Sequence, residues 1–216
     1  MSSIRPELTA VPERIKRLPV DDRGYPVPWF VAWKDDKPEF RAADADKFVR
    51  AIKRKLCWVC GDPLGVNVAF VAGPMCGINR TSAEPPCHYD CAKWSAVNCP
   101  FISNPAAVRR EDDLINNAAL RDNAPGCAIT RNPGVAMLWI TRQHEVFNDG
   151  KGKALIHMLD PLRVEWYARG RAATREEVLA SIDAGLPALE AIAQTQPGAM
   201  DVLKKYVERF QKWIPE

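Results

Sequence analysis

The stretch Cys57-Trp-Val-Cys-Gly61 decides how the fold of this chain is interpreted, because it places two thiols in one tight turn. A Cys-x-x-Cys-Gly turn presents two thiolates on one side of a short loop, and its glycine relieves the backbone strain. Zinc requires four such donors in a tetrahedron. The stretch, called the knuckle below, therefore predicts a second pair of donors elsewhere in the chain.

The segment His88-Tyr-Asp-Cys91 offers the second pair of donors. Residues three apart share one face of a helix, so His88 and Cys91 present a nitrogen and a sulfur together. Cys87 and Cys91 are also a reachable helical pair, and spacing alone leaves that alternative open. We predict a zinc ion bound by Cys57, Cys60, His88 and Cys91.

A competing interpretation is that Cys57 and Cys60 are simply buried thiols, because free cysteine is among the most buried residue types. For Cys76, Cys99 and Cys127 that interpretation is preferred, since each lacks a close second donor. Seven cysteines are an odd number, and the charged N-terminal segment lacks an apolar leader. These features favour a reducing cytoplasm, where clustered cysteines more often bind a metal than form disulfides.

The composition is that of a folded globular chain. Its 216 residues are 47% hydrophobic and 26% charged, which suits one core. The formal net charge is only +3, so a basic surface for nucleic acid would have to be local. No stretch approaches the roughly 20 apolar residues of a membrane span, and we expect no membrane partner.

The pattern of residues predicts an α+β fold, with a polar N-terminal arm at 1–24 and a single domain at 25–216. Strands are expected at 27–33, 39–41, 66–72, 75–79, 134–141, 144–147, 155–158 and 164–167. Helices are expected at 45–55 after an Asp44 cap, at 88–97, from the capping box Thr174-Arg-Glu-Glu177 onward, and at 199–213. A weak helical pattern at 113–120 lies within a surface excursion. The strands should form a small, mostly antiparallel sheet with flanking helices.

The order of a knuckle, a strand pair and a helix with the second ligand pair resembles the treble-clef zinc finger. The resemblance covers about residues 56–98, which we expect to form an embedded zinc module. Treble-clef scaffolds commonly present the loop and helix beside the metal as a recognition surface.

Several longer strings resemble a group of uncharacterised zinc-knuckle proteins from tailed bacteriophages and actinobacteria. They are Arg23-Gly-Tyr-Pro-Val-Pro-Trp-Phe30, the knuckle, Gly73-Pro-Met-Cys-Gly-Ile-Asn-Arg80, Glu84-Pro-Pro86 and Cys99-Pro-Phe101. In that group the position matching Cys87 is often a small hydroxyl residue, while the matches to His88 and Cys91 are kept. The resemblance therefore favours His88 as the ligand. It also implies a phage or mobile-element setting in a host cytoplasm, and no mechanism.

The function that we predict is a zinc-stabilised protein that contacts nucleic acid or a host protein, with a structural metal. The candidate contacts are Lys53, Arg54 and Lys55 before the knuckle, Arg80 and Glu84 in the loop, Lys93 on the zinc helix, and the aromatics Trp58 and Tyr89, which we expect to be exposed. For any single basic residue, a solvated surface position is the competing interpretation. The alternative is a host-enzyme inhibitor that acts purely by protein contact, with an interface anchored by tryptophans, although tryptophans at such positions more often belong to the core. These tryptophans are Trp29, Trp33, Trp139, Trp166 and Trp213.

An enzyme is the remaining alternative, and the residues of the chain argue against it. A His-Asn-His nuclease resembles a treble clef with a catalytic divalent ion, yet this chain has only His88, His144 and His157, and His88 is assigned to zinc. Asn79, Arg80, Glu84 and Asn98 offer a polar pocket beside the zinc without fixed geometry. A deaminase-like zinc site needs a His-x-Glu motif, which is missing. No catalytic residue is assigned.

Overall fold

The fold is given by a computed structural model that describes residues 4–104, 133–150, 152 and 154–216. The helical segments are α1 (Glu13–Lys16), α2 (Ala45–Arg54), α3 (Pro74–Asn79), α4 (Tyr89–Asn98), α5 (Pro100–Ser103), α7 (Arg175–Ala193), α8 (Ala199–Phe210) and the 3-10 turn η1 (Gln211–Trp213). The strands are β1 (Val31–Lys34), β2 (Lys37–Ala43), β3 (Val68–Ala72), β4 (Thr81–Ser82), β5 (Ala136–Thr141), β6 (His144–Asn148), β7 (Ala154–Met158), β8 (Arg163–Ala168) and β9 (Arg171–Ala172). Cys127 and the helical pattern predicted at 113–120 lie outside the described residues.

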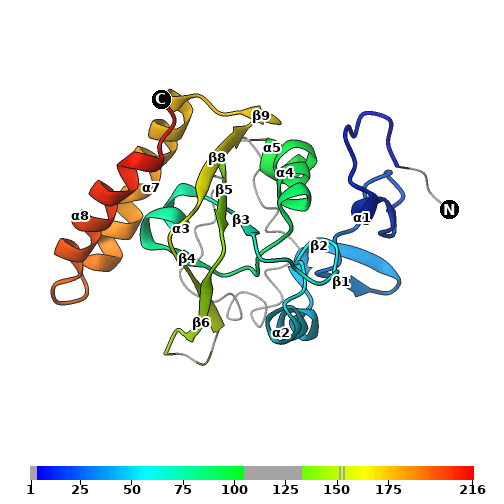
Figure 1. The fold of residues 1–216 in the computed structure, drawn as a ribbon, viewed down its shortest axis with the longest axis horizontal. Coiled ribbons are helices and arrows are strands. Elements are labelled where there is room, and N and C mark those ends of the chain that lie inside the picture. Colours follow the sequence, from blue (N-terminus) through cyan, green and yellow to red (C-terminus); the bar gives the residue numbers. More distant parts are fainter. Residues whose placement is uncertain (1–3, 105–132, 151, 153) are drawn as a thin grey trace.

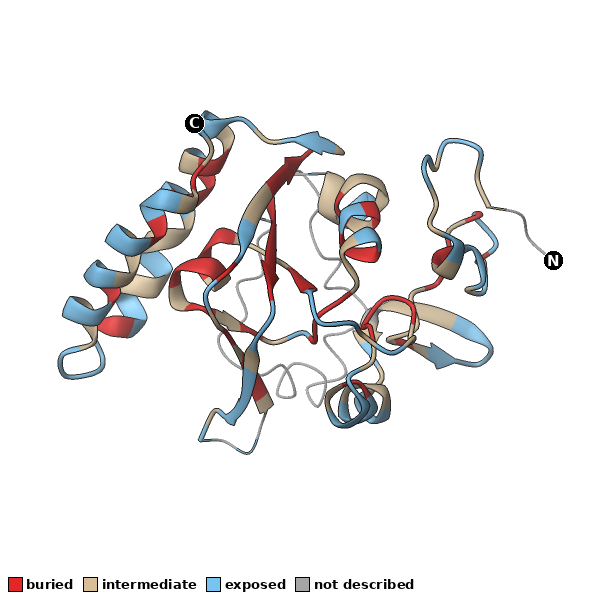
Figure 2. Cartoon of the chain, in the orientation of Figure 1, coloured by how far each residue is buried: buried red, intermediate tan, exposed pale blue. Residues whose placement is uncertain are grey.

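An antiparallel sheet with strand order β3-β5-β8-β9 forms the centre of the molecule (Figure 1). Alternate residues of β5 point to opposite faces, so Met137 and Trp139 join one buried cluster while Leu138 and Ile140 join another. Helices α3, α7 and α8 cover the first face, and α4 covers the second. Buried residues accordingly concentrate on the strands and on the inner sides of these helices (Figure 2).

The face covered by α3, α7 and α8, called the aromatic face below, is packed around Trp139. This side chain is fully buried and stacks on Phe210 of α8, with 6.5 Å between ring centroids. Trp166 meets the same Phe210 ring edge-on at 6.0 Å. The last helix therefore packs back on the sheet, as predicted.

None of the helices among the described residues is long and apolar enough to cross a bilayer.

Local sequence signals placed several elements correctly. The β1-β2 hairpin turns through Asp35 and Asp36, which both have positive φ, as tight hairpin turns require. The Asp44 side chain accepts a hydrogen bond from the Lys47 N–H at 3.0 Å and caps α2. At the start of α7 the predicted Thr174 capping box is complete. Each of these signals acts within a few residues, which is why the sequence reveals it.

The predicted return strand at 75–79 is wrong, because this segment is the helix α3. Pro74 takes the first helical turn, where its missing N–H costs nothing. Gly77 lies so close to the aromatic face that an added Cβ would be 2.6 Å from the Phe210 ring. Met75 and Ile78, three residues apart, are both buried on that side. Tertiary packing against α7 and α8 thus selects a helix here.

The described residues form three antiparallel sheets, β1-β2, β3-β5-β8-β9 and β4-β7-β6, where the sequence predicted one. The chain bends after β5, where the Gln143 N–H donates to the Thr141 hydroxyl at 3.2 Å. The next hairpin, β6-β7, therefore leaves the central sheet and pairs with β4, with Thr81 opposite His157. The α+β class is confirmed, and the single sheet is corrected to three.

Candidate metal centre

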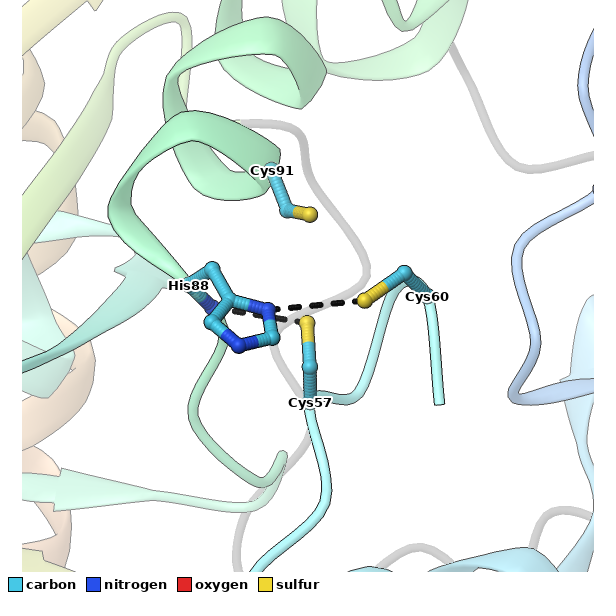
Figure 3. Close-up of side chains that lie close together, drawn as sticks. All are labelled: Cys57, Cys60, His88 and Cys91. Atoms are coloured by element: carbon cyan, nitrogen blue, oxygen red, sulfur yellow. Dashed lines mark hydrogen bonds between the residues drawn. The ribbon is translucent and has the colours of Figure 1, made fainter. Parts of the chain in front are cut away.

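Four side chains point toward one another where the loop after α2 meets the start of α4 (Figure 3). The ligand atoms of Cys57, Cys60, His88 and Cys91 all lie within 4.8 Å of one another. His88 is the N-cap residue of α4, and Cys91 lies in its first turn. The four residues predicted from the sequence are therefore gathered into a group that could hold a metal ion. Within the described ranges, no other group of three or more metal-binding side chains is found.

Backbone hydrogen bonds and a glycine shape the knuckle. The Cys57 N–H donates to the Asp62 carbonyl at 2.8 Å, and the Gly61 N–H donates to the Cys57 carbonyl at 2.8 Å. Gly61 has φ +78°, and an added Cβ would lie 2.7 Å from the Trp29 ring. Only glycine combines that backbone conformation with that close approach. The turn therefore needs the glycine that the motif supplies.

The second pair of donors is anchored to the central sheet through Cys87. The Ala69 N–H of β3 donates to the Cys87 carbonyl at 2.9 Å, and the Cys87 N–H donates back to the Ala69 carbonyl at 2.8 Å. This pairing fixes the chain immediately before α4. The Cys87 thiol is buried and interacts with the Cys57 thiol, but it falls outside the group of four.

The His88 imidazole is oriented by a hydrogen bond on the side remote from the cysteines. Its Nε2 lies 3.0 Å from the Pro63 carbonyl oxygen, which can only accept, so Nε2 carries the proton. Its Nδ1 then faces the cluster as an acceptor and lies 3.4 Å from the Cys60 sulfur, with which it forms a hydrogen bond (Figure 3). A carbonyl that fixes the tautomer of a histidine ligand is a common outer-sphere feature of zinc sites.

The cysteines of the cluster shift one another's pKa values in opposite directions. Hydrogen bonds from Cys60, Cys87 and Cys91 hold the pKa of the Cys57 thiol far below its ordinary value. The hydrogen bond to Cys57 raises the pKa of Cys60 to about 11, and it also raises the pKa of Cys91. The pKa of His88 is raised as well, chiefly by Cys57. A divalent cation binds such a cluster by replacing its protons.

The predicted basic contacts Lys53, Arg54 and Lys55 lie at the C-terminal end of α2 with exposed side chains. Lys55 has φ 51° and ends the helix just before the knuckle. None of the three forms an ion pair with another described residue. Lys93 is exposed on α4. These four cations flank the candidate metal centre on its two neighbouring helices.

Other predicted contacts lie in different environments. Glu84 is exposed in the loop after β4, where its backbone N–H donates to the Ser82 hydroxyl at 3.1 Å. Tyr89 is half-buried, and its hydroxyl donates to a carboxylate of β8. Trp58 is buried and stacks on Phe30 with 5.0 Å between ring centroids. The expectation that Trp58 is exposed is therefore wrong.

Arg80 lies on the aromatic face of the central sheet, opposite the cysteines. Its guanidinium pairs with Asp160 and lies 5.6 Å from the ring centroid of Trp139. The residue ends α3 with φ 57° and is only 8% exposed. Arg80 therefore does not lie beside the candidate metal centre, and it takes no part in the polar pocket that was predicted there.

N-terminal residues pack against the candidate metal centre, a contact that the sequence did not predict. Ile15 of α1 is fully buried in the cluster that contains the candidate ligands Cys57, Cys60 and Cys91. Val11 and Leu18 pack against the same cluster. Val11, Ile15 and Leu18 are spaced four and three residues apart, as apolar residues on one face of a helix are. This spacing is the sequence signal that could have predicted their burial.

No protein-family model, curated protein or solved structure matches the chain at a significant level. The chemistry of the site is therefore inferred from its own residues.

Proposed function

We propose that this chain is a zinc-stabilised binding protein whose metal is structural and whose partner is nucleic acid. The observation that carries the first part is the convergence of four donor atoms within 4.8 Å. Three thiolates and an imidazole are a donor set of structural zinc, and soft thiolates select zinc over magnesium or calcium. Four protein ligands fill the tetrahedron, so no position remains for a substrate or an activated water.

Residues 56–98 support a treble-clef-like description of the module. The knuckle supplies the first ligand pair, the Ala69–Cys87 pairing takes the place of a strand pair, and α4 supplies the second ligand pair. Helix α3 and strand β4 lie between these parts and depart from the simple pattern. In our proposal the metal joins the knuckle that follows α2 to the first turn of α4, and so fixes the position of one helix relative to the other.

The C-terminal end of α2 supports nucleic acid as the partner. Lys53, Arg54 and Lys55 are exposed cations without carboxylate partners among the described residues, and they directly precede the knuckle. Phosphate contacts from such cations supply most of the sequence-independent affinity for nucleic acid. Lys93 on α4 extends the basic surface beyond the knuckle. The resemblance to tailed-bacteriophage proteins gives this proposal its setting, a phage or mobile element in a host cytoplasm.

Measurement of the metal content tests whether the chain binds zinc through the four candidate ligands. Protein purified without a chelator is expected to carry one zinc ion per chain, and Cys57→Ala and His88→Ala are expected to carry none. Cys87→Ser is the matched control, because it removes the thiol beside His88 and should keep the metal. Wild-type protein without zinc, or zinc loss only in the Cys87 variant, would contradict the proposal.

Titration of labelled DNA and RNA tests the partner. The double variant Lys53→Glu/Arg54→Glu should weaken binding and reduce the slope of log affinity against log salt by about 2. Lys204→Glu/Lys205→Glu makes the same charge change on α8 and should have little effect. Degradation of the nucleic acid that depends on added divalent metal would favour the nuclease alternative. Neither binding nor degradation would favour a host protein as the partner.

A further inference from the structure

We propose that Arg14 belongs to the candidate metal centre and tunes its affinity for zinc by offsetting the negative charge of the thiolates. This inference rests on the proposed function, since it requires the cluster to bind zinc. It extends the site from four ligands on the module to the N-terminal segment, which the sequence placed outside the domain.

Two ion pairs attach the N-terminal segment to the module. An Arg17 nitrogen lies 2.5 Å from a carboxylate oxygen of Asp62, directly after the knuckle. An Arg14 nitrogen lies 3.4 Å from a carboxylate oxygen of Asp90, between the two ligands of α4. One arginine thus contacts each of the two ligand-bearing segments.

Packing holds the segment in the same place. Ile15 lies between the two arginines in the sequence and is 0% exposed. It belongs to the buried cluster that includes Cys57, Cys60 and Cys91. Earlier in the segment, the Thr9 N–H donates to the Asn98 side-chain oxygen at 3.2 Å, at the C-terminal end of α4. The segment therefore lies along the zinc module rather than apart from it.

The charge balance of the site explains what the arginines do. Three thiolates around a divalent cation leave one net negative charge, and Asp62 and Asp90 add two more. Burial lowers the pKa of the Arg14 guanidinium, but Asp90, Cys60 and Cys91 together raise it above the ordinary value. Arg14 pairs with Asp90 between the two ligands of α4 and so places a positive charge beside the thiolates. Arg17 reaches the site through Asp62.

Zinc affinity, measured by competition with a chromophoric chelator, tests the inference. Arg14→Gln is expected to weaken zinc binding roughly 3- to 10-fold, below the range for partners hydrogen-bonded to a ligand, because the guanidinium is partly exposed. The loss should shrink as salt is raised, since salt screens exposed charges. Arg14→Lys should restore most of the affinity, and Arg17→Gln should have a smaller effect.

Lys16→Gln is the matched control, because this cation on the same helix pairs with Glu13 instead of the module. Its zinc affinity should equal that of the wild type. Equal affinity in Arg14→Gln, or a loss in that variant that salt and Arg14→Lys leave unchanged, would overturn the inference while leaving the zinc site in place. Absence of zinc from the wild type would instead overturn the proposed function.

Discussion

The two faces of the central sheet are packed by different means. Large side chains such as Phe70, Trp139 and Trp166 fill the aromatic face. The opposite face, called the knuckle face below, also contains large side chains such as Trp58 and Trp94, but more than half of its buried residues are small. These small residues are Ala51, Ala69, Ala92, Ala96, Ala136, Cys57, Cys60, Cys87 and Cys91. Apolar burial stabilises a fold by about 25 cal/mol per Å², and small side chains supply little of that area. Under the zinc proposal, we therefore expect the knuckle face to depend on a metal cross-link more than the aromatic face does.

Loss of a metal ligand should have the largest effect on the free energy of unfolding, and this effect should be greater on the knuckle face than on the aromatic face. Zinc at a thousandfold excess over its dissociation constant stabilises a protein by about 4 kcal/mol, and Cys91→Ser should lose that stabilisation. Denaturant unfolding with and without zinc measures it. When the wild type is chelated, hydrogen exchange should quicken in the knuckle and α4 before β8 and α7. Equal loss of protection from hydrogen exchange on both faces would show that the aromatic face depends on the metal as much as the knuckle face does.

A cavity on the aromatic face should give the next largest effect. Phe210→Ala removes the ring that stacks on Trp139 and meets Trp166, at a cost of about 3 kcal/mol in the free energy of unfolding. The folded variant should still bind zinc as the wild type does, because the ligands lie on the other face. Denaturation curves and a zinc titration check both parts. Weakened zinc binding in this variant would show that the faces are coupled.

The knuckle glycine offers a smaller and more local test. Gly61→Ala should cost about 2 kcal/mol in the zinc-bound protein, because the alanine must adopt φ +78° with its Cβ against Trp29. Gly65→Ala is the control, since an added Cβ there meets nothing within 4 Å. Thermal melting of the two zinc-bound variants gives the comparison. Equal melting temperatures would mean that the turn tolerates a side chain.

The smallest effect concerns the cap of α7 and depends on pH. Hydrogen bonds from Arg171 and from the Thr174 N–H hold the pKa of Glu177 down to about 2. A carboxyl with a lowered pKa stabilises the fold above its unfolded pKa of about 4.3, and this contribution is lost as the pH falls toward 2. Solvent screens this surface pair, so Glu177→Gln should cost only about 0.5 kcal/mol at pH 7.

Stability measured between pH 7 and 2 should therefore fall less steeply in Glu177→Gln than in the wild type, with or without zinc. Glu190→Gln on the same helix serves as the control and should follow the wild-type curve. A zinc-dependent effect of Glu177→Gln would contradict the independence of the two faces.

The parts of the fold that the sequence predicts are those whose causes lie close together in the chain. The Asp44 cap, the Thr174 capping box and the Cys57 to Gly61 turn are each determined within a few residues. Helix α3 was predicted as a strand because Gly73-Pro74 suggests a turn, while the contacts that favour the helix come from α7 and α8.

The candidate site shows the same limit. The four donors are visible in the sequence because each pair is closely spaced. Arg80 was assigned to the zinc side from its position in a loop, but its partner Asp160 is distant in sequence. The role of Ile15 also depends on distant residues, since it packs against cysteines of the later module. Periodicity cannot reveal which distant residues meet.

The pairing of Ala69 with Cys87 also bears on how the chain behaves in concentrated solution. β3 pairs with β5 on one edge, and the segment that carries the metal ligands covers its other edge at Ala69. An uncovered strand edge is a template for strands of other chains, and Val68-Ala-Phe-Val-Ala72 is uncharged and rich in strand-forming residues. Removal of the proposed zinc is expected to loosen this segment, and copies of the chain should then aggregate through β3.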